Sequence, residues 1–130
     1  MLAGVGLFVV LLALIGLAAL SAHKQSVASR KASDQFVQAL LSGDVDASYN
    51  LFSSQTRQNL SHGQWSDEIA QLSLFFTARK PVFSSLSVPA KGAVLAVYKI
   101  PGNDGQYTFS VHLTKQGGSW YVVYFSSTRQ

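Results

Sequence analysis

The side chains best suited to acid–base chemistry are three histidines and six carboxylates. A general base must lie within hydrogen-bond reach of its partner, so a histidine and a carboxylate on neighbouring elements would suggest catalysis. His112 is the only histidine in a predicted strand, and it shares the more polar face with Ser110 and Thr114. The predicted strands contain no Asp or Glu, and Asp104 falls in a turn. We therefore expect His112 to be a solvated surface residue, and we predict no catalytic residue.

The other ionisable residues have simpler explanations. Asp67 and Glu68 fall in the first turn of a predicted helix, where the helix dipole favours negative charge. His62 lies in the turn before that helix, and His23 follows the apolar N-terminal run. The histidines are therefore not expected to converge, and the chain has no cysteine. We predict neither a metal site nor a cofactor. An isomerase or hydrolase that uses His112 is the least favoured of three functional hypotheses, and the other two are given at the end of this section.

Length and charge narrow the class of protein. A chain of 130 residues has room for one domain. The net charge of +4 is uneven, because Lys24, Arg30 and Lys31 precede the first acidic residue, Asp34, and the remainder is nearly balanced. A nucleic-acid binder would carry a basic stripe on its folded part. The sequence shows none, so we predict no binding to nucleic acid.

The N-terminus is predicted to be a membrane element. Leu2 to Leu20 is an uninterrupted run without charge, close to the roughly 20 residues that cross a bilayer as a helix. We predict a transmembrane anchor over residues 1–22 that contacts lipid through this run. A secretory signal peptide is the alternative, since Ala19-Leu20-Ser21 fits a cleavage site. The length favours the anchor, because signal cores usually have about 7–15 apolar residues.

Residues 23–33 are predicted to form a basic, helical juxtamembrane stalk. Lys24, Arg30 and Lys31 would lie at the membrane surface, where anionic lipid attracts them. The positive-inside rule would place this flank in the cytoplasm. The serine- and glutamine-rich remainder is instead typical of exported bacterial domains, and the two signals conflict.

Helical spacing and turn chemistry predict three helices before Pro81. Apolar residues at helical spacing define the first helix, which ends at Gly43. Asp44 or Asp46 caps the second, which runs to Leu60. A capping-box pattern, Ser61 to Gln64, begins the third. The apolar faces are Ala32, Phe36, Val37, Leu40 and Leu41 in the first helix and Trp65, Ile69, Leu72 and Phe76 in the third.

After Pro81 the hydrophobic period changes from 3.6 to 2, which predicts an antiparallel meander. The first strand is interrupted by Pro89 and belongs at an edge. Helices followed by strands favour an α+β fold with about three short helices packed on one face of a four-stranded antiparallel sheet. The predicted strands are Val82 to Val88, Ala93 to Ile100, Gln106 to Lys115 and Trp120 to Phe125.

Aromatic residues provide the candidate binding sites. Tyr49, Trp65 and Tyr98 could line a pocket for an apolar ligand, although filling the core is the alternative for each. The last strand is apolar on both faces. One face must meet the helices, and the other suggests a protein partner or self-association. Its predicted contact residues are Tyr121, Val123 and Phe125.

Several motifs resemble bacterial members of the nuclear transport factor 2-like (NTF2-like) superfamily. They are Phe36 to Asp44, Ala47 to Phe52, Arg57 to Ser61, and Trp65. The resemblance covers roughly Ala32 to Ser127, and it implies a cone in which a curved sheet wraps a layer of helices. Many members that this chain resembles are extracytoplasmic domains behind one membrane helix. The resemblance therefore places the predicted domain, residues 34–130, outside the cytoplasm.

Together these features predict a non-enzymatic, single-pass membrane-anchored interaction or assembly module. Such a module would be a subunit of a bacterial cell-envelope complex. The alternative is a domain that binds a small apolar ligand and uses the cone as its pocket.

Overall fold

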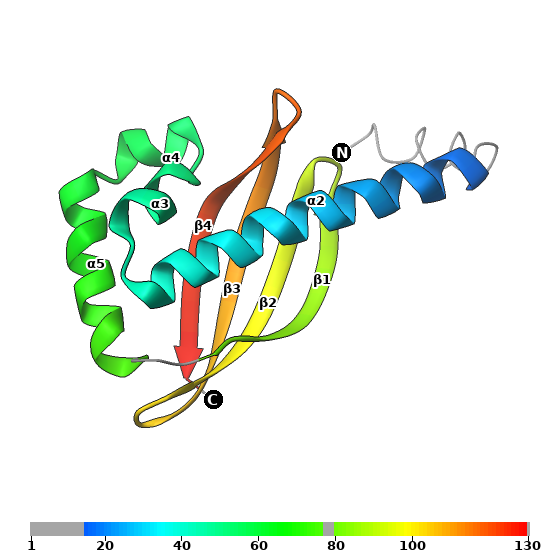
Figure 1. Ribbon diagram of the computed structural model, residues 1–130. Coiled ribbons are helices and arrows are strands. Elements are labelled where there is room, and N and C mark those ends of the chain that lie inside the picture. The colour runs from blue at the N-terminus through cyan, green and yellow to red at the C-terminus, as the bar shows by residue number, and fades with distance from the viewer. Residues whose placement is uncertain (1–14, 77–79, 130) are drawn as a thin grey trace.

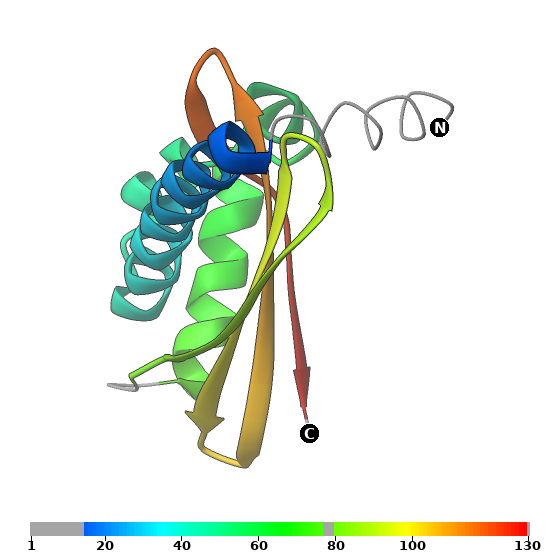
Figure 2. The same cartoon turned by 90° about the vertical axis from the view of Figure 1, so that its right-hand side faces the viewer.

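The computed structural model describes residues 15–76 and 80–129, and it shows one layer of helices on one face of a sheet (Figure 1, Figure 2). The predicted α+β class is confirmed. The helices are α2 (Ile15–Ser42), α3 (Val45–Asn50), α4 (Ser54–Asn59) and α5 (His62–Phe75). The strands are β1 (Val82–Ala90), β2 (Ala93–Gly102), β3 (Gly105–Gln116) and β4 (Ser119–Arg129).

The sheet is an antiparallel meander in the order β1-β2-β3-β4, so β1 and β4 are its edges. The predicted edge position of the strand that contains Pro89 is thus confirmed. Alternate residues of the central strands are buried against the helices, as the period of two predicted. They are Val94, Ala96, Tyr98 and Ile100 in β2 and Phe109, Val111 and Leu113 in β3.

Local turn chemistry sets the helix boundaries as predicted. Gly43 has φ +77°, and it ends α2 in a Schellman motif: its N–H donates to Leu40 O, and the Asp44 N–H donates to Ala39 O. The Asp44 side chain then accepts from the Ala47 N–H and caps α3. At α5, the capping box between Ser61 and Gln64 is complete in both directions.

We expect Gly43→Ala to lower the free energy of unfolding by about 1 kcal/mol, because a Cβ is disfavoured in the left-handed region. No atom lies within 4 Å of the added Cβ, so the cost is one of backbone conformation alone. Gly63→Ala is the matched control, because the space around Gly63 is equally open but its backbone is helical, within α5. That change should leave stability unchanged or raise it by up to about 1 kcal/mol. Urea denaturation of both variants would test the difference in sign.

The predicted second helix is wrong in one respect, because it is two helices separated by residues 51–53. There Phe52 forms a parallel bridge with Val122 of the edge strand β4. The Val122 N–H donates to Leu51 O at 2.7 Å, and the Ser53 N–H donates to Val122 O at 2.9 Å. An edge strand has unpaired backbone groups, and satisfying them here outweighs continuing the helix.

The predicted faces of the last strand are also corrected. The register between β3 and β4 shifts at His112/Leu113, so Val123 is an extra residue in β4. A one-residue insertion moves all later side chains to the opposite face. Phe125 therefore packs against the core, 5.1 Å from the Phe109 ring, while Tyr124 lies on the outer face near His112. Tyr121, Val123 and Phe125 do not form one surface.

The first described helix, α2, is continuous from Ile15 to Ser42, and it includes the predicted helical stalk. Ser29 and Ser33 on this helix are fully buried, so packing against the sheet begins before the predicted domain start at residue 34. Most of the predicted span, Leu2 to Leu20, lies outside the described residues. Within residues 15–76 and 80–129, no helix has the length and apolar character needed to cross a membrane.

Candidate binding groove

An open groove of about 520 Å³ lies between α4, α5 and β4. Its floor is aromatic, formed by Phe52, Trp65 and Phe125. The rim carries polar side chains that can donate or accept hydrogen bonds. The full lining is Phe52, Gln55, Thr56, Asn59, Leu60, Trp65, Glu68, Val123, Tyr124 and Phe125.

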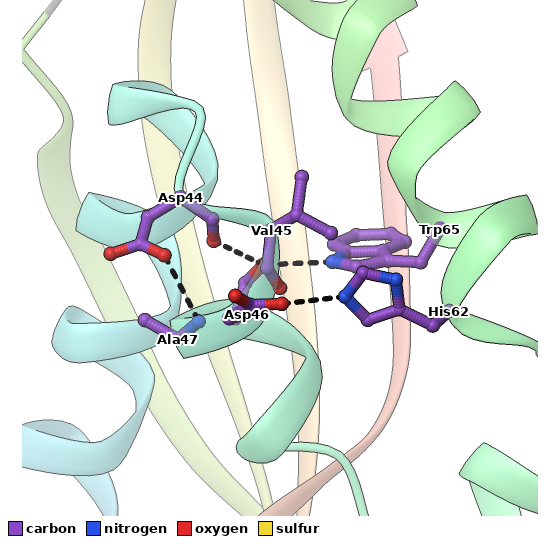
Figure 3. Close-up of polar contacts among 7 residues, drawn as sticks. Asp44, Val45, Asp46, Ala47, His62 and Trp65 are labelled. Atoms are coloured by element: carbon purple, nitrogen blue, oxygen red, sulfur yellow. Dashed lines mark hydrogen bonds and ion pairs between the residues drawn. The ribbon is translucent and has the colours of Figure 1, made fainter.

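The orientation of Trp65 is held by contacts with α3 and α2. Its indole N–H donates to Ser48 Oγ at 2.7 Å, and that buried hydroxyl donates in turn to Asp44 O at 2.8 Å (Figure 3). On its other side, the indole stacks on Phe36, with centroids 5.8 Å apart. These contacts leave the indole little freedom, so the floor of the groove is formed before any ligand binds.

The wall formed by β4 depends on the bulge. The Thr56 hydroxyl donates to Val123 O at 2.9 Å and ties α4 to the extra residue of the strand. At the mouth of the groove, the apolar side chain of Val123 remains 41% exposed and the aromatic side chain of Tyr124 remains 57% exposed. The sequence pattern could not place these two residues together, because regular alternation assigns them to opposite faces.

The predicted ligand-binding residues do not converge. Trp65 lines the groove, but Tyr49 uses its hydroxyl to brace the end of α4, donating to Leu60 O at 2.8 Å and Arg57 O at 3.3 Å. Tyr98 lines a separate cavity of about 170 Å³ beneath α2. Sequence reasoning missed the groove residues of α4, whose polar side chains carry no local sign of their location.

The smaller cavity contains a polar cluster that links α2 to the sheet. The Tyr98 hydroxyl donates to Asp34 Oδ1 at 2.5 Å and is 2.9 Å from Ser33 Oγ. Burial, followed by the hydrogen bond to Asp34, raises the pKa of Tyr98 well above its usual value. Arg30 pairs with Asp34 at 3.6 Å and lies over the Phe83 ring at 3.8 Å.

The predicted membrane-surface residues therefore differ from one another. Arg30 is held against β1 by its contacts with Asp34 and Phe83, whereas Lys31 is exposed. The side chain of Lys24 lies outside the described part of the chain. Lipid binding by these residues stays a prediction.

The described part of the chain contains a histidine–carboxylate pair that the sequence did not predict. His62 Nε2 lies 2.6 Å from Asp46 Oδ1, so the pair joins the start of α5 to α3 (Figure 3). Both side chains are more than half exposed, and they lie outside the groove lining. Exposed ion pairs contribute little stability.

The groove lining itself carries one carboxylate, Glu68, and no histidine. His112 is not part of the groove lining, and its ring centroid is 5.4 Å from that of Tyr124 at the mouth of the groove. In the described part of the chain, no three potential metal ligands gather at one site. The groove lining offers an apolar floor on which apolar groups can bind, with hydrogen-bonding side chains at the rim.

The helical layer on a curved four-stranded sheet is the NTF2-like, cystatin-like fold. An NTF2-like protein of unknown function from Shewanella baltica OS155 superposes with a TM-score of 0.62 and 17% identity, covering 82% of this chain and 94% of that one. A protein of unknown function with a cystatin-like fold from Nostoc punctiforme PCC 73102 also reaches 0.62, with 12% identity over 81% and 90% of the two chains.

A third similar structure, from Novosphingobium aromaticivorans, is provisionally named an aromatic ring hydroxylase. Its TM-score is 0.56 with 13% identity, over 79% of this chain and 87% of that one. Proteins with this fold thus carry different functional descriptions, and sequence identities this low establish only a shared fold. No protein-family model and no curated protein sequence matches this chain.

Proposed function

We propose that this chain is a non-enzymatic, single-pass membrane-anchored interaction module of a bacterial cell-envelope complex, with its domain outside the cytoplasm. Leu2 to Leu20 is the anchor, since it is uncharged and of spanning length. The groove between α4, α5 and β4 binds an apolar group of a protein partner. The observation that carries the proposal is this pre-formed groove with an aromatic floor and a polar rim.

The dimensions and chemistry of the groove support binding. Its volume of about 520 Å³ is within the range of ligand sites, and it is open along one side, as the insertion of side chains from a partner requires. Val123 and Tyr124 at the mouth can each bury further area on contact. Interfaces concentrate their binding energy in central aromatic clusters of this kind, surrounded by polar groups.

A small apolar ligand is the second candidate for the same groove. The aromatic floor favours it, because Phe52, Trp65 and Phe125 form an apolar surface able to bury a ring or an acyl chain. The two candidates differ in the mass of the bound molecule, so one labelling experiment can separate them.

The test places a photo-crosslinking phenylalanine analogue at Tyr124 of the full chain in native membranes. We expect an adduct of protein mass that is not formed when the analogue replaces Ser127, which lies further along β4, exposed and outside the groove lining. An adduct of small-molecule mass would support the ligand alternative. No adduct at position 124, or equal adducts at both positions, would contradict the proposed site.

We expect Val123→Asp to abolish the adduct at position 124 and to weaken partner binding by about 30-fold, which corresponds to about 2 kcal/mol. A charge beside the aromatic floor must be desolvated when the groove is filled. Binding of the apolar dye anilinonaphthalene sulfonate should fall in parallel. Because Val123 is 41% exposed, folding should persist, which a thermal melt would check. Unchanged labelling and dye binding would argue against the groove.

A further inference from the structure

Basic and acidic residues are unevenly distributed along the chain. The segments 15–33 and 80–103 together carry six of the ten Lys and Arg residues and none of the six Asp and Glu residues. The first segment is the N-terminal part of α2, and the second includes β1 and β2. All six acidic residues lie in the rest of the chain, which has a formal charge of −2.

The structure brings the two acid-free segments together. Arg30 of α2 lies over the Phe83 ring of β1, so α2 crosses the sheet at this edge. Figure 1 shows the N-terminal end of α2 extending beyond β1, on the side away from α4 and α5. The groove lies at the opposite edge strand, β4. The domain thus has a basic edge, which we define as β1, the β1–β2 turn and the adjoining surface of α2 around Lys31.

The direction of α2 sets the distance between the basic edge and the proposed anchor. The helix is unbroken from Ile15, and the fully buried Ser29 lies nine positions after Leu20. At about 1.5 Å per residue, this helix covers about 14 Å. The headgroup layer is about 5–8 Å thick, and the Debye length at physiological salt is about 8 Å. The basic edge is therefore within electrostatic reach of the membrane surface.

We infer that the basic edge lies against anionic lipid headgroups, and that the groove consequently opens on the side of the domain away from the membrane. This inference rests on the proposed anchor. Charge complementarity supports it, because Lys31 and Lys91 are exposed on the basic edge, and the neighbouring acidic side chain, Asp34, is paired with Arg30. Val82 and Val88 in β1 are 63% and 62% exposed, and a mixture of lysine and apolar side chains suits the interface of a bilayer.

This orientation also accounts for the edge strand β1. An edge strand presents unpaired backbone groups on which a further strand could pair. Close to headgroups, that pairing is hindered, whereas the other edge, β4, is partly covered by its bridge with Phe52. The two edges are protected by different means, one by the chain itself and one by the membrane.

Single-cysteine labelling can test the orientation cleanly, because the chain has no cysteine. Ser87→Cys in β1 and Gln58→Cys in α4 place a fluorophore at exposed positions on opposite sides of the domain. The full chain is reconstituted in phosphatidylcholine vesicles with or without phosphatidylglycerol, and a quencher is attached to the headgroups. We expect the quencher to remove most of the fluorescence at position 87 and little at position 58.

We expect the quenching at position 87 to fall when phosphatidylglycerol is omitted and in the Lys31→Glu/Lys91→Glu variant, and to be unaffected by Arg57→Glu in α4. Equal quenching at both positions in a chain that floats with vesicles would overturn the orientation and leave the anchor intact. A chain that does not float would contradict the anchor, and with it this inference. Retention of the chain on DNA, with no effect of anionic lipid, would assign the basic edge to nucleic acid instead.

Discussion

Replacing Phe36 with alanine is expected to lower the free energy of unfolding by about 3–5 kcal/mol. Phe36 on α2 is fully buried at the point where the helices meet the sheet. Its ring centroid lies 5.3 Å from that of Phe52 and 5.8 Å from those of Trp65 and Phe125. Truncation removes the buried area of the ring and leaves a cavity. The three rings around that cavity belong to other segments of the chain and are held there by their own packing, so they cannot move to fill it. Since domains are stable by only about 5–15 kcal/mol, this is a large fraction of the total.

Urea denaturation of the full chain in detergent micelles would measure the loss. Phe36→Leu keeps much of the side-chain volume and should lower the free energy of unfolding by about 1–2 kcal/mol. This variant provides a measurable value if the alanine variant does not fold. Val27→Ala is the control, because Val27 is on the same helix but 57% exposed, and a change within about 0.5 kcal/mol is expected. A loss below 1 kcal/mol for Phe36→Ala would contradict the packing described above.

The second large effect is expected for Tyr98→Phe, which should lower the free energy of unfolding by about 2 kcal/mol at neutral pH. Phenylalanine preserves the packing but removes the hydrogen bond to Asp34 and leaves the buried Ser33 hydroxyl without this neighbour. Hydrogen bonds to charged groups are worth about 1.5–3 kcal/mol. We take a value inside that range, because the Asp34 side chain is 40% exposed and solvent screens the pair.

The same substitution should change the response to alkaline pH. In the folded chain, the pKa of Tyr98 is raised by burial and by Asp34, whereas in the unfolded chain it is near 10. The contribution of the neutral phenol is therefore complete below pH 10, and it is lost as the pH rises toward the raised value. Above pH 10 the wild type should lose stability faster than Tyr98→Phe, by at most about 1.4 kcal/mol per pH unit.

Tyr107→Phe is the matched control for both measurements. The Tyr107 hydroxyl donates to Asp104 at 2.9 Å, and this hydrogen bond also raises the pKa of Tyr107, but the pair is exposed at the β2–β3 turn. Water can replace an exposed hydrogen bond, so this variant should change stability much less than Tyr98→Phe. Equal effects of the two substitutions would show that the cluster under α2 has no special role in joining the helix to the sheet.

This junction between α2 and the sheet matters for the proposed function. The proposed anchor would be attached to the domain through α2, and the contacts of Arg30, Asp34 and Tyr98 hold that helix at one angle to the sheet. A fixed angle is what would keep the groove at β4 directed away from the membrane. The chain would then present its binding site to partners in the aqueous phase.

Local physical chemistry made much of this fold predictable from the sequence. Gly43 ends a helix because only glycine adopts the left-handed region without strain. Ser61 and Gln64 begin one because their side chains satisfy free backbone N–H groups. In β3, alternation placed His112, Ser110 and Thr114 on the face away from the core, since it depends only on the period of an extended chain.

The binding groove depended on interactions between distant segments. The bulge at Val123 interrupts alternation, and Phe52 leaves a helix to pair with β4; neither has a short-range signal. The hydrogen bonds of Tyr98 with α2 likewise join residues that are separated in the sequence by 64 positions (Asp34) and 65 positions (Ser33). The sequence by itself determined the order of helices and strands and the apolar N-terminal run, because these follow from neighbouring residues, but it did not predict the division of the second helix into α3 and α4. Only the tertiary structure decided which aromatic side chains form the groove, because edge pairing and core packing compete across the whole chain.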